Sequence, residues 1–244
     1  MMRILIISDI HANLNALESV IKNAGQVDAV WCLGDLVGYG PDPNECIHLV
    51  QSLPNLICLP GNHDAAALGQ IDDQVFNNEA RISIQWLKSA LTRESKDFLR
   101  NLPEKLIIGD VTLCHGSPRN PIWEYILDTY TARENFKYFS TRLCLVGHTH
   151  LPAIYSISEG DGAEINLKIP LANQKISIQN KSIFNPGSVG QPRDQDPRAA
   201  YAIFYPETLI WESHRVNYDI IGVQKRIIQC GLPRRHAARL ADGW

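Results

Sequence analysis

The amino-acid sequence predicts an α/β fold, in which parallel strands and helices come first and a second, largely antiparallel sheet follows. Over the first 150 residues, short apolar runs alternate with segments of helical periodicity, as expected for parallel strands joined by helices. After residue 150 the pattern changes to short alternating strands. The chain has 244 residues, 45% of them hydrophobic, and we expect a single domain over residues 1–244 with a substantial core.

The first βαβ unit begins with the continuous apolar run at residues 4–7, which is typical of a strand buried on both faces. Asn13 is a suitable N-cap for a helix whose apolar residues then recur at helical spacing. The next strand covers residues 28–33. Acidic residues follow both strands, Asp9 after the first and Asp35 after the second. The order strand, helix, strand predicts that the two strands are parallel.

The remaining elements follow the same two patterns. We expect helices over residues 45–53, 131–139 and 220–228, and strands over residues 56–59, 105–108, 111–114, 142–146, 153–157, 164–169, 175–178, 182–184, 199–204 and 209–216. Residues 72–101 show helical spacing without a turn signal, which predicts two helices that flank the site or cover it as a lid. The basic C-terminal residues 234–244 are expected to form a loose, solvated tail.

The bulk properties argue against several classes of protein. The net charge of -3 and the pI near 6.2 provide no electrostatic footprint for a nucleic-acid-binding protein. No apolar stretch approaches the about 18 residues of a membrane span, and the N-terminal apolar run is too short for a signal peptide. We therefore expect a cytoplasmic protein. The sequence leaves open whether it forms a homo-oligomer.

The six cysteines are scattered without the CxxC spacing of metal or redox motifs. Four of them, Cys32, Cys58, Cys114 and Cys144, lie inside apolar runs, where cysteine behaves as a small buried hydrophobe. We therefore expect free buried thiols in place of disulfides or a zinc site.

Potential metal ligands follow five of the expected strands, where the loops of an open α/β sheet converge. They are Asp9 and His11, Asp35, Asn62 with His63, His115, and His148 with His150. One such residue at a strand end is more often a satisfied polar side chain or a helix N-cap. Five strand ends with this chemistry are much harder to explain in that way.

The donor set also predicts the kind of metal. Imidazole nitrogens and carboxylate oxygens without thiolate suit Mn, Fe, Ni, Co or Zn better than Ca or Mg. Because seven ligating side chains exceed the needs of one ion, we expect a site for two divalent ions that share a carboxylate. Pairs of this kind lie about 3.5–4 Å apart and stabilise the attacking and leaving oxygens of a phosphoryl transfer.

The motifs together resemble the signature of the calcineurin-like metallophosphoesterase superfamily. They are Asp9-x-His11, Gly34-Asp35, Gly61-Asn62-His63-Asp64, His115-Gly116 and Gly147-His148-Thr149-His150, in the order of that family. The resemblance implies a four-layer α/β/β/α sandwich of two mixed sheets, with the metal site at the carboxyl edge of the strands. In length the chain is most similar to the small bacterial and archaeal phosphodiesterases of the superfamily.

The resemblance further implies a role for each site residue. One ion would be bound by Asp9, His11 and His150, the other by Asn62, His115 and His148, and Asp35 would bridge the two. His63 would be the general acid that protonates the leaving oxygen. The two ions, with manganese as the expected choice, would activate a bridging hydroxide that attacks a small phosphoester substrate.

One departure from the superfamily pattern bears on the substrate. In protein Ser/Thr phosphatases an Asp-Arg pair follows the Gly-Asp motif, whereas Gly38-Tyr39 stands in that place here. Because a diester needs less cationic help than a dianionic monoester, we expect a phosphodiesterase. Arg119 and Arg193 are candidates to bind substrate phosphate, the alternative for each being a salt bridge within its loop. The alternative functions are a phosphomonoesterase, a nucleotide or protein phosphatase, and a catalytically idle metal-binding scaffold.

Overall fold

Two six-stranded mixed sheets pack face to face in the computed structural model of the protein, which describes residues 1–158 and 164–244. The first sheet has the strand order β3 (Ile57–Cys58), β2 (Ala29–Cys32), β1 (Ile4–Ile7), β11 (Ala199–Tyr205), β12 (Ile210–Val216) and β9 (Gln174–Ser177). The second has the order β4 (Lys105–Ile108), β5 (Val111–Cys114), β6 (Leu143–Leu145), β10 (Ser182–Asn185), β7 (Ala153–Ile157) and β8 (Ile165–Lys168).

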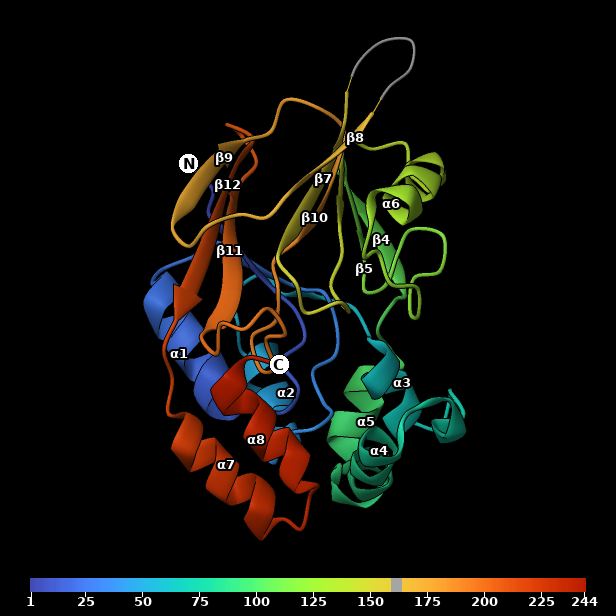
Figure 1. Cartoon of the computed structure of the whole chain (residues 1–244), viewed down its shortest axis with the longest axis vertical. Coiled ribbons are helices and arrows are strands. Elements are labelled where there is room, and N and C mark those ends of the chain that lie inside the picture. Colours follow the sequence, from blue (N-terminus) through green and yellow to red (C-terminus); the bar gives the residue numbers. More distant parts are fainter. Residues whose placement is uncertain (159–163) are drawn as a thin grey trace.

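Helices cover the outer faces of both sheets, which confirms the four layers α/β/β/α (Figure 1). The α-helices are α1 (Leu14–Ala24), α2 (Pro43–Gln51), α3 (Asn62–Ala67), α4 (Asn78–Ala90), α5 (Arg93–Arg100), α6 (Thr129–Asn135), α7 (Ile220–Gln229) and α8 (Arg234–Asp242). Two short 3₁₀ helices, η1 (Asp73–Val75) and η2 (Phe136–Tyr138), lie between them. The first sheet is covered by α1 and α2, and the second by α6.

Strand β1 shows how the layers are built from the sequence. Its side chains point alternately to the two faces of the sheet. Ile4 and Ile6 lie in the cluster between the sheets, together with Phe184 of the second sheet. Leu5 and Ile7 face the other way and pack in the cluster that includes α1. A strand that is apolar at every position is therefore buried on both faces.

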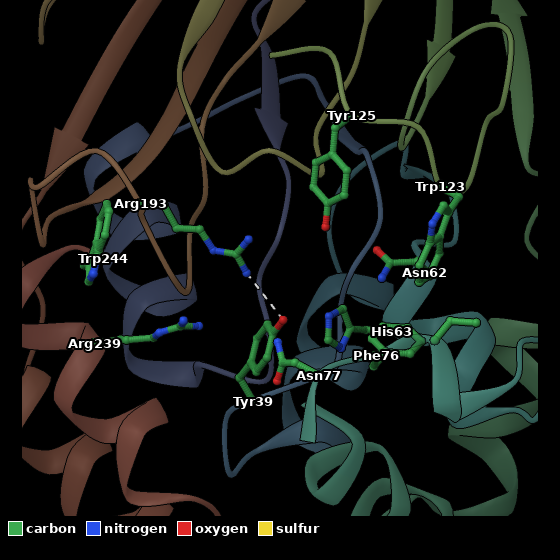
Figure 2. Close-up of a pocket in the computed structure, with 11 residues that line it drawn as sticks. Tyr39, Asn62, His63, Phe76, Asn77, Trp123, Tyr125, Arg193, Arg239 and Trp244 are labelled. Carbon is green, nitrogen blue, oxygen red and sulfur yellow. Dashed lines mark hydrogen bonds between the residues drawn. The ribbon is translucent and has the colours of Figure 1, made fainter. Parts of the chain in front are cut away.

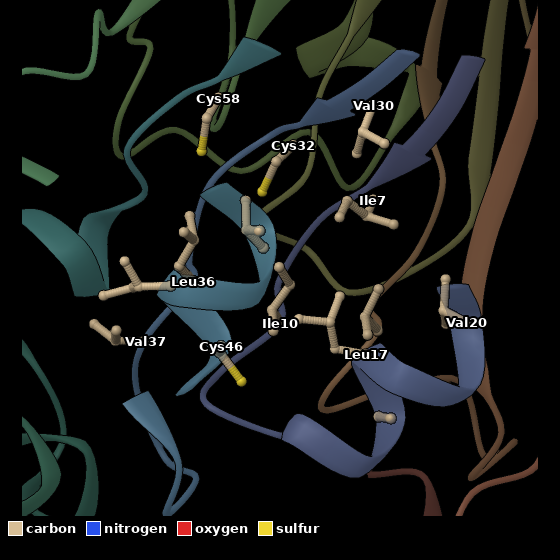
Figure 3. Packing of buried hydrophobic residues seen from close by; sticks show 14 of the residues in the cluster. Ile7, Ile10, Leu17, Val20, Val30, Cys32, Leu36, Val37, Cys46 and Cys58 are labelled. Atoms are coloured by element: carbon tan, nitrogen blue, oxygen red, sulfur yellow. The ribbon is translucent and has the colours of Figure 1, made fainter. Parts of the chain in front are cut away.

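Figure 3 shows part of the cluster between the first sheet and its helices. Leu17 and Val20 of α1 meet Val30 of β2 there, and Cys46 of α2 completes the same core. All six cysteines are free, and all except Cys230 are buried. The sequence-based expectation of free thiols is confirmed.

The strands after residue 150 do not form a sheet of their own. We expected a second, largely antiparallel sheet, but β9, β11 and β12 extend the first sheet and β7, β8 and β10 extend the second. Strand β11 pairs with the free edge of β1, and β10 pairs with that of β6. Alternation along a strand reports which of its faces is buried, and it does not report which edge the strand joins.

The C-terminal residues 234–244 are not a loose tail. They form α8, whose residues Ala237 and Leu240 are buried against Val223 and Ile227 of α7. Gly243 ends the helix in the left-handed conformation with φ +63°, which is the usual role of glycine at a helix C-terminus. The expectation rested on the basic residues of this segment and overlooked its short apolar face.

The region 72–101 contains α4 and α5, so the two helices expected there are confirmed. Leu87 and Leu99 of this pair pack with Ala67 of α3 in the core cluster of the first sheet. Within the described residues, none of the helices is long and apolar enough to cross a membrane.

We predict that Leu240→Ala destabilises the protein by about 2–5 kcal/mol, because it leaves a cavity between α8 and α7. Leu240 is 4% exposed. Ile221→Ala is the matched control, since Ile221 of α7 is 64% exposed and its loss should change stability by less than about 0.5 kcal/mol. Urea denaturation measures both. Equal, small effects of the two variants would mean that α8 is not docked in solution.

Candidate metal centre

The predicted ligands lie on loops at the carboxyl ends of strands from both sheets. Five of them, Asp9, His11, Asp35, His148 and His150, have positive φ angles, from +49° to +66°. This left-handed conformation is uncommon for residues other than glycine, and surrounding structure must hold it in place. Because this conformation occurs at five of the predicted ligands, we infer that these loops do more than reverse the chain direction.

Backbone hydrogen bonds hold these loops against one another. The amides of Asp9 and His11 donate to the carbonyls of Gly34 and Asp35, each at 3.0 Å. The amide of His148 donates to the Asp9 carboxylate at 3.1 Å. The amide of Gly190 donates to the Asp9 carbonyl at 2.9 Å. Segments far apart in the sequence are thus fixed around Asp9.

Gly61 allows the loop after β3 to approach Asp35 closely. A Cβ atom at this position would overlap the carboxylate and the backbone amide of Asp35. The next turn, α3, is joined to the same loop by Asp64, which accepts hydrogen bonds from the amides of Leu36, Val37 and Gly61 at 2.9–3.2 Å. Asp64 is the third residue of α3, and its carboxylate accepts from the amide of the N-cap residue Gly61. These contacts also align Asn62 and His63 with Asp35.

The structure brings six of the seven predicted ligands together in two overlapping clusters, and the seventh, Asn62, lies beside the second cluster. One cluster contains Asp9, His11, Asp35 and His150, and the other contains Asp35, His115 and His148, with the donor atoms of each within 4.8 Å of one another. Asn62 Oδ1 lies 3.3 Å from His115 Nε2. Each of the seven residues is at most 2% exposed. Asp35 is common to both clusters, as the position of a bridging ligand requires.

The four imidazoles are oriented as metal ligands are. One ring nitrogen of each faces a backbone carbonyl: His11 that of Val37, His115 that of Leu33, His148 that of Trp123, and His150 that of Gln191. Such a contact fixes a proton on that nitrogen and leaves the other nitrogen as a donor to metal. The remaining nitrogens face one another, 2.9 Å apart between His11 and His150 and 3.2 Å apart between His115 and His148.

The charges at the centre also favour bound cations. Asp35 Oδ2 is buried and accepts no hydrogen bond within the described residues. Burial, with the nearby charge of Asp35, raises the pKa of Asp9 to about 7. Burial disfavours protonated His115, yet the charges of Asp35 and Asp9 raise its pKa to about 10. Without a metal, a proton on His115 therefore balances the carboxylates, and we infer that this buried donor set fits two divalent cations.

His63 is buried beside the clusters but belongs to neither of them. Its backbone amide donates to Asp35 Oδ1 at 2.9 Å, and its ring nitrogen Nδ1 has no hydrogen-bond partner in the described part of the chain. The ring lies 4.5 Å from that of Tyr39 and 5.0 Å from that of Phe76, between centroids. Burial lowers the pKa of His63 to about 4.

A cavity of about 410 Å³ opens onto this centre through Asn62 and His63 (Figure 2). Its other lining residues come from the loop after β2, from η1 and the start of α4, from the loop before α6, and from the C-terminal part of the chain: Tyr39, Val75, Phe76, Asn77, Trp123, Tyr125, Arg193, Arg239 and Trp244. Sequence reasoning identified only Arg193 among the charged residues of this cavity. Arg239 was missed because its segment was interpreted as a tail.

The two arginines proposed for substrate binding have different surroundings. Arg119 forms an ion pair with Glu124 and lies with its guanidinium 5.9 Å from the centroid of the Tyr138 ring. Arg119 does not line the cavity. Arg193 does line it, and its guanidinium donates to Tyr39 Oη at 3.4 Å and to Gln191 Oε1 at 3.1 Å. Tyr39, which replaces the phosphatase arginine, therefore contacts an arginine from another loop.

The two packed sheets and the buried donor clusters define a metallophosphoesterase. The model of the calcineurin-like phosphoesterase family matches residues 2–178, and the chain belongs to this family, whose members hydrolyse phosphate esters with two metal ions.

Relatives match the whole chain. An uncharacterized protein of Methanocaldococcus jannaschii is 41% identical over 98% of both chains. A metallophosphoesterase structure from Sphaerobacter thermophilus is 46% identical, with a TM-score of 0.91 over 100% of this chain and 99% of that one. The structure of a hypothetical protein from Pyrococcus horikoshii OT3 shares the fold, with 20% identity and a TM-score of 0.79 over 100% and 99% of the two chains.

We predict that the isolated protein binds two transition-metal ions per chain and that Asp35→Asn abolishes the binding of both. This substitution keeps an oxygen to accept the His63 amide and removes the charge shared by the two clusters. His150→Ala should remove mainly one ion, because His150 belongs to one cluster only. Elemental analysis after metal loading and gel filtration measures the content. Loss of a single ion from Asp35→Asn would contradict the bridging role.

Proposed function

We propose that the protein is a dimetal phosphodiesterase. The observation that carries this proposal is the pair of buried donor clusters that share Asp35 and open, beside His63, into one cavity. Asp9, His11 and His150 would hold one ion and Asn62, His115 and His148 the other. When bound, two such ions lower the pKa of water and neutralise phosphoryl oxygens. The donor set suits manganese, and we propose a cytoplasmic setting and a small phosphoester substrate.

In this proposal His63 protonates the leaving oxygen. It lines the cavity next to Asn62, so its imidazole is placed to reach a substrate held there. Its low pKa means that the imidazole is neutral in the free protein at pH 7. A bound phosphoester adds negative charge close to the ring and thereby favours the protonated form. Proton donation by His63 is thus coupled to substrate binding.

The presence of all seven donors and His63 argues against an idle scaffold, because a scaffold has no use for an acid beside a metal site. A phosphomonoesterase is the second candidate, and the position of Arg193 favours it. The Arg193 guanidinium contacts Tyr39 at the place where the protein phosphatases have their arginine, so it could supply charge for a dianionic ester. We favour the diesterase because Gly38-Tyr39 stands where the protein phosphatases have an Asp-Arg pair, and a diester needs less cationic help than a dianionic monoester.

We predict that His63→Asn leaves the metal content unchanged and slows turnover about 10²–10⁴-fold on esters with poor leaving groups. The loss should be much smaller for nitrophenolate, which departs without a proton. Thymidylyl-thymidine and thymidine 5′-(p-nitrophenyl phosphate) supply the poor and the good leaving group. An equal loss on both substrates would assign His63 to phosphate binding instead of proton transfer.

We predict that kcat/KM of the manganese-loaded protein is higher for bis(p-nitrophenyl) phosphate than for p-nitrophenyl phosphate. Tyr39 cannot neutralise the second charge of the monoester. Arg119→Ala is the control and should leave this ratio unchanged, because Arg119 is paired with Glu124 outside the cavity. A monoester preference that disappears in Arg193→Ala would instead establish the phosphomonoesterase.

A further inference from the structure

Two arginines face the same cavity without an acidic partner. Arg193 comes from the loop between β10 and β11, and Arg239 comes from α8. Neither forms an ion pair with a carboxylate in the residues that the structure describes. The nearest acidic residue in sequence to Arg193, Asp194, is paired with Arg215. Neither guanidinium group is therefore neutralised by a direct ion pair among the described residues.

Both guanidinium groups retain unused donors inside the protein. Nε of Arg193 and Nε of Arg239 are buried and have no hydrogen-bond partner among the described residues. Burial and the adjacent charge of Arg193 lower the pKa of Arg239. Two neighbouring cations with unpaired, desolvated donors are unfavourable unless an anion joins them, because each loses hydrogen bonds to water and repels the other.

Arg239 lies at one end of the cavity, whereas the guanidinium of Arg193 reaches inward and donates to Tyr39 Oη at 3.4 Å. Figure 2 shows Arg193, Arg239 and Trp244 at one side, Asn62 and Trp123 at the other, and Tyr39 and His63 between them. A phosphoryl group held beside Asn62 and His63 would therefore leave the guanidinium group of Arg239 free. An anionic group bound by Arg239 would then be a second group of the same ligand, distinct from the phosphoryl group beside Asn62 and His63.

The cavity also has aromatic walls. Tyr125 stacks on His148 with a centroid separation of 3.7 Å, and Phe76 packs edge-on against Trp123 at 5.1 Å. Such surfaces accept planar rings such as nucleobases or aryl groups. The cavity thus combines a place for a phosphoryl group, aromatic surfaces and a cationic end.

We propose that Arg193 and Arg239 form a second anion-binding site, so that the substrate is a phosphodiester carrying another phosphate group beyond the ester that is hydrolysed. This inference rests on the proposed phosphodiesterase function and specifies its substrate class. Paired guanidinium groups suit phosphate because their N–H donors match several phosphate oxygens at once. In this arrangement Arg193 serves the second phosphate and does not make up the charge of a monoester.

The test compares two substrates that differ by one phosphate: thymidine 5′-(p-nitrophenyl phosphate) and its 3′-phosphorylated form. The variants are Arg239→Gln, Arg239→Lys and the control Arg235→Gln. Arg235 lies on the same helix and, among the described residues, pairs with Glu79 at 3.5 Å, and its side chain is 60% exposed. The control therefore removes the same charge from the same helix outside the cavity. Thermal denaturation establishes that each variant is folded.

For the wild-type protein with manganese, we expect kcat/KM to be about 10- to 100-fold higher for the 3′-phosphorylated substrate, the range expected for charge-assisted hydrogen bonds. This ratio should fall towards one in Arg239→Gln, recover in part in Arg239→Lys, and stay at the wild-type value in Arg235→Gln. A wild-type ratio near one, or an equal ratio in Arg239→Gln, would overturn the proposal. If the ratio were equal in Arg239→Gln and the wild type, the two arginines could bind free phosphate at most and would not bind a second phosphate of the substrate.

A binding measurement separates this inference from the proposed activity. Isothermal titration calorimetry of the metal-free protein should show tighter binding of thymidine 3′,5′-bisphosphate than of thymidine 5′-monophosphate, and Arg239→Gln should remove the difference. Absence of hydrolysis with this binding pattern intact would reject the phosphodiesterase and keep the anion site. Hydrolysis of the diesters without any difference in binding would reject the anion site alone.

Discussion

The burial of two neighbouring carboxylates, Asp9 and Asp35, is the constraint on which the site depends. Charged groups in a protein interior are stable only when opposite charge or hydrogen bonds compensate them. Here the compensation comes from loops of both sheets: backbone amides reach Asp9, and imidazoles surround Asp35. The loops can supply it only in left-handed conformations that most residues avoid. The sandwich fixes both strand ends rigidly enough to keep them there.

Most of the ligand set was predictable from the sequence, because each ligand follows an apolar run that had to be a buried strand. His115, for example, comes directly after the run 111–114, and the carboxyl ends of neighbouring parallel strands meet at one edge. The resemblance to a known family then supplied the four layers and the order of the ligands. The structure adds that the donor atoms lie close together. Which ion each residue binds is still a prediction.

The features that could not be predicted depend on contacts between residues far apart in the sequence, and such contacts leave no local sequence pattern. Strand β11 is apolar along its length and buried at six of its seven positions. This pattern does not indicate which strand edge it joins, so its place beside β1 was not predictable. Arg119 and Arg193 both follow motifs in loops, and only the position of Glu124 distinguishes them. Arg239 was overlooked because three basic residues suggested a solvated segment, while the buried side of α8 contains only a few apolar residues.

The division of the cavity between parts of the chain has a consequence for how such enzymes diversify. The predicted metal ligands and His63 all lie within residues 2–178, which match the family model, whereas Arg193, Arg239 and Trp244 lie beyond it. In the proposed function, the reacting centre and the second anion site therefore lie in separate stretches of the sequence, whereas the aromatic walls Phe76, Trp123 and Tyr125 come from the first stretch. Substitutions in the C-terminal stretch can exchange one substrate for another without disturbing the reacting centre, and a single ancestral catalyst can thereby give rise to many specificities.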